Sequence, residues 1–142
     1  LAQREGGEIL CGGKIPNLES PFDKGAFLEP TVVSNLDYQS RTSNEEIFGP
    51  VVTLHQFKTD DEAIEMANCT DYGLAGSVWT SDSIRGKELA EKIETGMVWV
   101  NTWLHRDLRV PFGGVKDSGV GSEGGRWSLS FFSQPVNICV KE

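Results

Sequence analysis

The sequence lacks three features that would each place it in a broad class of proteins. It has no excess of basic residues, because 13 Lys and Arg stand against 21 Asp and Glu, a formal net charge of −8. Nucleic acid and anionic membrane surfaces would repel that charge, so we expect neither as a partner. No apolar run approaches the roughly 20 residues of a membrane-spanning helix, and no charged-then-apolar signal sequence opens the chain. We therefore expect a soluble, cytoplasmic protein.

Cysteines are also few. The three are Cys11, Cys69 and Cys139, an odd number without the short spacings of zinc ligands. The two histidines, His55 and His105, have no metal-binding partner at ligand spacing. We expect no disulfide framework, no metal site, and three buried thiols.

What is present is an alternation of strand and helix patterns. A chain of 142 residues can bury about 68% of its unfolded surface, which is enough for one hydrophobic core and one domain. Thr59 and Glu62 fit a capping box, and Ser81 or Asp82 can cap a second helix. Strands are expected at 8–11, 27–33, 51–57, 75–80 and 97–101. This order predicts an α/β fold, a sheet with flanking helices and parallel strand pairs.

The two ends of the chain follow other patterns. Residues 1–7 are typical of a helix end closed by Gly6 and Gly7, as in a chain cut from a longer protein. From Thr102 to about residue 132 the sequence is glycine-rich without sustained periodicity, which predicts a long loop of the kind that often carries function. The tail 136–142 predicts a short edge strand that can pair with another element or subunit.

Common nucleotide and nucleophile motifs do not explain the sequence. Residues 119–124 match G-x-G-x-x-G literally, but the preceding strand, following helix and downstream acid of a dinucleotide fingerprint are missing. No P-loop Gly-Lys-Ser/Thr occurs, and neither Ser118 nor Ser122 fits the serine-hydrolase elbow. These motifs therefore assign no nucleophile.

The segment "NEEIFGPVV", residues 44–52, combines two carboxylates, an aromatic residue and a Gly-Pro pair in front of an apolar strand. Pro50 has a fixed φ and favours an extended conformation for Gly49, so the next residues enter a strand. Glu45, Glu46 and Phe48 are thus expected at the mouth of that strand.

Seven segments in order resemble the C-terminal part of the aldehyde dehydrogenase superfamily: "GGEILCGG", "GAFLEPTVV", "NEEIFGPVV", "DEAIEMAN", "YGLAGSVWT", "TGMVWVN" and "PFGGVKDSGVGSEGG". They cover nearly the whole chain. The resemblance implies the C-terminal portion of the catalytic domain at 1–130 and an oligomerisation strand at 131–142. One departure is Gly121-Ser122-Glu123-Gly124, where relatives usually have Gly-Arg-Glu-Gly.

The same resemblance implies a cofactor site. In the family, the glutamate of the E-I-F-G-P motif binds the nicotinamide ribose hydroxyls and the phenylalanine lies beside the nicotinamide ring. These positions are Glu46 and Phe48, and the implied cofactor is NAD, with NADP as the alternative. A carboxylate suits two O–H donors, and an aromatic face suits a planar ring. The other interpretation is structural, with Glu46 capping a neighbouring segment and Phe48 in the core.

In the family, the catalytic cysteine, general-base glutamate, oxyanion asparagine and Rossmann domain all precede the region that this chain resembles. The resemblance therefore implies no catalytic residue in this chain, which we expect to be inactive by itself. Implied partners are a small-molecule aldehyde, the N-terminal remainder of the protein, and further copies in a dimer or tetramer. The alternative is a non-catalytic interaction module on the same fold.

The loop "NTWLHRDLRVPFGG" carries the expectation about substrate. It resembles muconic semialdehyde dehydrogenases in particular, whose substrates have a carboxylate far from the aldehyde. Arg106 is the expected carboxylate anchor and Arg109 the second, because guanidinium groups bind carboxylates with two parallel hydrogen bonds. Trp103 and Phe112 are expected to pack against the substrate chain. The alternative is that Asp107 or nearby glutamates neutralise both arginines as a surface network.

Overall fold

The computed structural model describes residues 1–142, and they form two compact units, Leu1–Thr70 and Asp71–Glu142. Each unit has its own small sheet or sheets. The expectation of one hydrophobic core is therefore wrong. The completely or nearly buried apolar side chains are Val33 and Leu36, which both belong to the first unit. No helix has the length and apolar character needed to cross a membrane.

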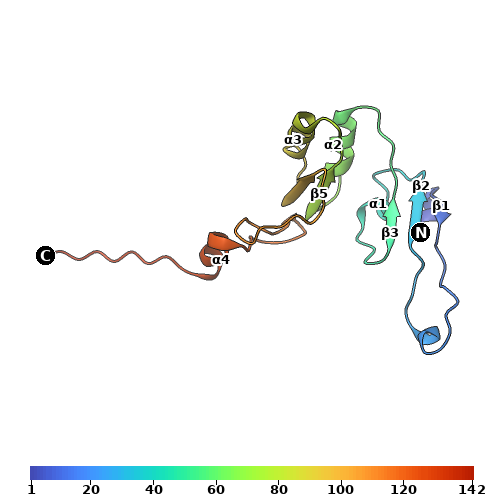
Figure 1. Cartoon of the computed structure of the whole chain (residues 1–142), viewed down its shortest axis with the longest axis horizontal. Helices are drawn as coiled ribbons and strands as arrows, with labels where there is room; N and C mark the ends of the chain where they lie inside the picture. Colours follow the sequence, from blue (N-terminus) through green and yellow to red (C-terminus); the bar gives the residue numbers. More distant parts are fainter. The chain divides into compact units, whose positions relative to one another are not determined.

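The first unit contains a three-stranded sheet in the order β1-β2-β3 (Figure 1). Strand β2 pairs antiparallel with β1 and parallel with β3. The elements of this unit are the 3-10 helix η1 (Ala2–Glu5), β1 (Glu8–Cys11), the 3-10 helix η2 (Phe22–Lys24), β2 (Thr31–Ser34), α1 (Arg41–Asn44), β3 (Val51–Thr53) and α2 (Asp60–Asn68).

Two strands of the first unit are shorter than the sequence predicts, for identifiable reasons. Strand β2 begins at Thr31 and not at residue 27, because the preceding Pro30 has no N–H to donate to a ladder. It ends at Ser34, since Asn35 has a φ of 59° that turns the chain away. Strand β3 stops at Thr53, where its register with β2 ends; the Leu54 N–H still donates to the Val33 carbonyl at 2.8 Å, and residues 55–57 belong to no strand.

The second unit contains two pairs of strands. The parallel pair is β5 (Ala75–Val78) with β6 (Met97–Val100), joined through α3 (Ser83–Ala90); the antiparallel pair is β4 (Tyr72–Gly73) with β7 (Val115–Lys116). The last helix is α4 (Gly125–Phe132). Both β2–β3 and β5–β6 confirm the prediction of parallel pairs.

The predicted helix starts are confirmed. The Thr59 hydroxyl accepts from the Glu62 N–H at 3.2 Å, and Asp82, not Ser81, caps α3 by accepting from Ile84 and Arg85. Glu62 does reach back, although its carboxylate accepts from the N–H of Lys58 at 2.6 Å and not from the cap residue itself.

Two other expectations are wrong. Residues 102–132 are not one loop, because β7 and α4 lie within them. The sequence hides α4 because Gly124 and Gly125, with φ of 104° and 48°, give its start the composition of a turn. The three cysteines are exposed and not buried. The tail after Phe132 forms no helix or strand within this chain, so its pairing with another strand stays a prediction.

Candidate functional site

The first candidate site is built on α1, a single helical turn. Its start is fixed by Ser40, whose hydroxyl accepts from the Ser43 N–H at 3.3 Å. Asn44, the last residue of the helix, ties it to the preceding segment, because its amide donates to the carbonyls of Tyr38 at 2.6 Å and Ser40 at 3.1 Å. Glu45 ends the helix in an extended conformation. The chain therefore leaves α1 directly into residues 46–50.

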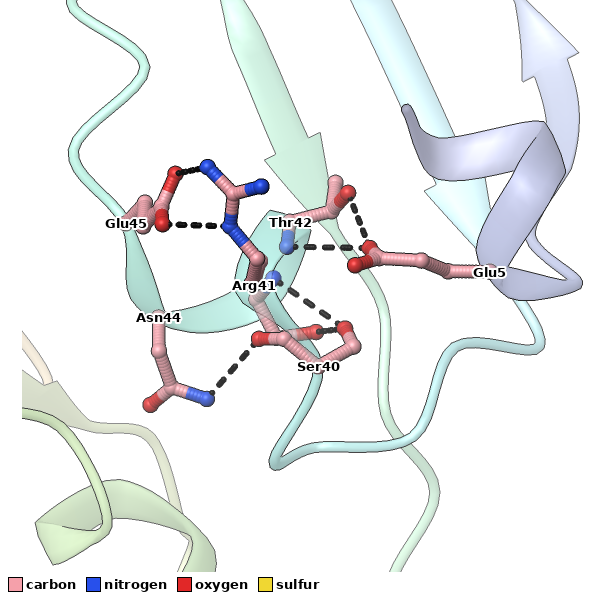
Figure 2. A network of polar contacts seen from close by, with 7 residues as sticks. Glu5, Ser40, Arg41, Thr42, Asn44 and Glu45 are labelled. Atoms are coloured by element: carbon pink, nitrogen blue, oxygen red, sulfur yellow. Dashed lines mark hydrogen bonds and ion pairs between the residues drawn. The ribbon is translucent and has the colours of Figure 1, made fainter.

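Glu45 is committed to an ion pair within the helix. Its two carboxylate oxygens accept from Nε and Nη2 of Arg41 at 2.6 Å and 2.9 Å, a planar fork that Figure 2 shows. These hydrogen bonds lower the pKa of Glu45 below its ordinary value. Both side chains are more than half exposed, so solvent screens the pair. Glu45 is thus occupied by a local structural contact.

A second carboxylate reaches α1 from far along the sequence. Glu5, the last residue of η1, places Oε2 at 3.1 Å from the N–H of Thr42 and at 2.5 Å from the Thr42 hydroxyl (Figure 2). Thr42 is buried, with 7% of its surface exposed. The side-chain hydrogen bond from Thr42 lowers the pKa of Glu5, against an opposing effect of desolvation.

Glu46 and Phe48 differ from these residues because their side chains are exposed and stabilise no other part of this chain. Glu46 is exposed and takes part in no hydrogen bond or ion pair. Phe48 is 91% exposed and has a φ of 54°, a left-handed conformation that is uncommon for a bulky residue. Within this chain Glu46 caps no neighbouring segment and Phe48 is not part of a core. Their predicted contact with a cofactor is an untested prediction.

The second candidate site lies in the loop after β6. Trp99 donates its indole N–H to the carbonyl of His105 at 2.9 Å, and its ring lies edge-on to Trp103 with centroids 5.0 Å apart. Phe112 is fixed by two backbone hydrogen bonds with Glu123, at 2.8 Å and 2.9 Å. These contacts hold both ends of the loop that carries the two arginines.

The two arginines have different surroundings. Arg109 binds Asp107 through Nε at 2.9 Å and 3.1 Å and through Nη2 at 2.5 Å, with 88% of its side chain exposed. The Arg106 guanidinium instead lies over the Phe112 ring, 3.9 Å from its centroid, and has no carboxylate partner. The surface-pair alternative therefore holds for Arg109 and not for Arg106.

Arg106 and Phe112 line a cavity of about 240 Å³. Its other walls are Gly96, Met97, Val98, Trp99, His105, Asp107, Val110 and Pro111. Trp103 does not line the cavity, but its ring contacts Trp99, which does. The cavity combines apolar and aromatic walls with one unpaired cation, a combination that suits a small organic acid. No group of three His, Cys, Asp or Glu side chains is placed to hold a metal ion.

Sequence reasoning missed Glu5, Thr42 and Trp99. Glu5 and Thr42 are 37 residues apart and neither belongs to a motif, so no local signal connects them. Trp99 had a detectable signal, because a tryptophan in an apolar strand just before a polar loop is well placed to anchor that loop.

The ion pair of Arg109 gives a prediction about titration. Its side-chain hydrogen bonds, followed by its backbone N–H, lower the pKa of Asp107. Because the pKa is lowered in the folded state, the pair stabilises the fold fully at pH values above the ordinary aspartate pKa, near pH 4. This stabilisation is lost as pH falls through the lowered pKa. We expect the Asp107 carboxyl, followed by carbon NMR, to titrate below an ordinary aspartate. In Arg109→Gln its midpoint should rise. Equal midpoints would mean that the pair does not persist in solution.

Comparison with known proteins agrees with the sequence and the fold. Residues 1–138 match the model of the aldehyde dehydrogenase family. The chain is 45% identical over 141 residues to a 2-aminomuconic 6-semialdehyde dehydrogenase of a Pseudomonas species, covering 99% of this chain and 29% of that protein. It is 44% identical over 137 residues to a 2-hydroxymuconic semialdehyde dehydrogenase of Pseudomonas putida, covering 96% of this chain and 28% of the relative.

A solved structure resembles the chain in both sequence and fold. Betaine aldehyde dehydrogenase from Staphylococcus aureus, crystallised with NAD+, matches with a TM-score of 0.86 and 43% identity, over 92% of this chain and 26% of that one. The chain belongs to the aldehyde dehydrogenase family, and its α/β architecture is a part of that family's fold. It spans less than a third of the length of these relatives.

Proposed function

We propose that the chain is part of an NAD(P)-dependent aldehyde dehydrogenase, in which Glu46 and Phe48 contact the nicotinamide half of the cofactor. The cofactor, when bound, supplies the hydride acceptor for oxidation of an aldehyde to a carboxylic acid. The observation that carries the proposal is Phe48, an aromatic residue 91% exposed on backbone with a φ of 54°. Left-handed backbone and exposed apolar surface both cost free energy, and residues of this kind gather at binding sites.

The chemistry of the two side chains fits the group. An ionised carboxylate only accepts hydrogen bonds, so Glu46 can receive both hydroxyls of a ribose. Phe48 offers a flat apolar face two residues further on, which can orient a planar ring. Neither residue distinguishes NAD from NADP, because the nicotinamide half is common to both. NAD is the primary proposal, supported by the NAD+ complexes of similar enzymes.

The proposed enzyme needs more than this chain. Its nucleophile, general base and dinucleotide-binding domain would come from the N-terminal remainder of the same protein. The thiols here give no substitute, since Cys11, Cys69 and Cys139 contact only a backbone carbonyl or an amide oxygen and no base. Many large apolar side chains of both units are exposed in this chain. Their exposure supports the proposal that the remainder of the protein or another copy buries them.

We also propose that residues 131–142 include the strand that joins copies into a dimer or tetramer. Val136, Ile138 and Val140 are about four-fifths exposed and alternate with Asn137 and Cys139. Apolar side chains at every second position suit an edge strand that buries one face against a partner.

For the substrate, we propose a semialdehyde with a distant carboxylate, such as 2-aminomuconic or 2-hydroxymuconic semialdehyde. Arg106 is the primary anchor, because it lines a cavity and lacks an ion-pair partner. Arg109 is second, since it would first have to leave Asp107. Phe112 and Trp103 would pack against the carbon chain. The names of similar enzymes support this substrate class.

The test of the cofactor site is the affinity of the full-length protein for NAD+, measured by calorimetry. Glu46→Gln should raise Kd about tenfold, because it removes a charged acceptor worth about 1.5 kcal/mol or more. Asp61→Asn makes the same change in charge on the exposed side of α2 and should leave Kd unchanged.

An unchanged Kd in Glu46→Gln would contradict the proposal. The second candidate, an interaction module without catalysis, rests on the many exposed apolar side chains. It would be favoured if the unaltered full-length protein bound no NAD+ and reduced none in the presence of aldehyde.

A further inference from the structure

Glu5 forms an unusual link in the first unit. It is the last residue of η1, and Gly6, with a φ of 90°, turns the chain immediately after it. One oxygen, Oε2, accepts from both the N–H and the hydroxyl of Thr42 (Figure 2). Two donors from one residue fix the direction of the contact as well as its length.

The helix that receives this contact cannot hold its own position. Helix α1 has four residues, and a single turn is far below the length at which a helix is stable alone. Its first N–H groups have no partner within the helix. Ser40 satisfies the N–H of Ser43, and Glu5 satisfies that of Thr42. Glu5 thus acts as a second cap, supplied from a distant part of the sequence.

The position of α1 determines where the cofactor segment begins. Glu46 lies four residues after Thr42, and the intervening Glu45 is extended with φ −79° and ψ 140°. Extended chain advances about 3.3 Å per residue, so a small rotation of the helix moves Glu46 by an ångström or more. A displacement of about 1 Å can cost a hundredfold in the function of a positioned group.

We propose that Glu5 is a positioning residue for the cofactor segment, and that its contact with Thr42 holds α1 so that Glu46 and Phe48 meet the nicotinamide half. This inference rests on the proposed function of those two residues. Glu5 itself touches neither the cofactor nor the substrate; it acts through the helix.

A purely structural role makes a different prediction. If Glu5 only stabilised the fold, its removal would lower the unfolding temperature and leave cofactor binding by the folded protein unchanged. A positioning role requires weaker cofactor binding with an intact affinity for aldehyde. The two roles are therefore separated by binding measurements on folded protein.

The experiment uses the full-length enzyme and NAD+. Glu5→Gln and Thr42→Val should each raise Kd for NAD+ and KM for NAD+ about tenfold, with KM for the aldehyde unchanged. Thr42→Ser keeps both donors and should restore the affinity of the unaltered protein. Hydrogen exchange of peptides covering 40–50 in cofactor-free protein should be faster in Glu5→Gln and normal in Thr42→Ser.

Glu8→Gln is the matched control. Glu8 belongs to β1 and accepts from the Asn35 side chain at 3.0 Å, a contact across 27 residues that does not reach α1. It should leave Kd for NAD+ and exchange in 40–50 unchanged. An equal rise in Kd for Glu8→Gln and Glu5→Gln would overturn the positioning role.

The outcomes also separate this inference from the proposed function. If Glu46→Gln weakens NAD+ binding and Glu5→Gln does not, the positioning role is overturned and the cofactor site stands. If Glu46→Gln leaves NAD+ binding unchanged, the cofactor site itself fails, and the role of Glu5 fails with it.

Discussion

Arg106→Ala in the full-length enzyme is expected to lower kcat/KM for a carboxylate-bearing semialdehyde by about 2 to 3 kcal/mol, the contribution of hydrogen bonds between charged groups. The guanidinium lies over Phe112 at 3.9 Å and forms no ion pair with a carboxylate of its own chain. A stacked guanidinium keeps its N–H groups free at the ring edge, so it can bind a carboxylate without first breaking an ion pair.

The selectivity of this loss is the informative quantity. A neutral aliphatic aldehyde has no group for Arg106 to bind, so its kcat/KM should change little. Arg109→Ala is the matched control, because the same side chain three residues on is already paired with Asp107. We expect a smaller loss for that variant on the carboxylated substrate. Equal losses for the carboxylated and neutral aldehydes in Arg106→Ala would mean that Arg106 only holds the loop together.

Sequence similarity cannot replace this experiment. The relatives named for muconic semialdehydes and the betaine aldehyde dehydrogenase are almost equally identical to the chain. Betaine aldehyde carries a cation, which Arg106 would repel, whereas a muconic semialdehyde carries an anion. We therefore expect Arg106, and not the overall match, to distinguish these substrate classes.

The parts of the fold that were predictable have local causes. Helix α2 begins where Thr59 and Glu62 predict, because a capping box needs only four consecutive residues. The parallel pairs follow from the order of strands and helices. The segment around Glu46 was recognisable through its resemblance to the family's E-I-F-G-P motif, which lies within a few consecutive residues.

The parts that could not be predicted depend on distant contacts. Glu5 and Thr42 meet only after β1 and β2 pair, and nothing in either segment indicates the other. Which arginine is free depends on a neighbouring aspartate and a phenylalanine further along the loop. Helix α4 was missed because two glycines with positive φ begin it, a composition typical of a turn.

The second prediction concerns the backbone beneath the same cavity. Gly96 donates its N–H to the Gly73 carbonyl at 3.0 Å and immediately precedes β6. A Cβ added at this position would overlap the carbonyl oxygen of Gly113, and would lie 2.8 Å from that residue's carbonyl carbon. These are backbone atoms, which cannot rotate aside as a side chain can.

The segment that would have to move is itself confined. A Cβ at Gly113 would lie 2.5 Å from the Gly121 carbonyl oxygen, so this backbone is closely packed on its far side as well. Gly96→Ala should therefore destabilise the second unit by about 3 kcal/mol or more, in the range of severe overpacking. Because Gly96 and Phe112 line one cavity, the variant should also lose affinity for the carboxylated aldehyde.

Gly76→Ala provides the matched control for this prediction. Gly76 lies in β5, beside β6, and the nearest atom to an added Cβ is Ile93 Cγ2 at 3.5 Å, an ordinary contact. Alanine in a strand restricts the unfolded chain more than glycine does, so this variant should be as stable as the unaltered protein or slightly more stable. Thermal unfolding of the purified full-length proteins compares the two. Equal midpoints for Gly96→Ala and Gly76→Ala would mean that residues 96 and 113 are not in contact in the folded protein, and the cavity beside Arg106 would then need a different wall.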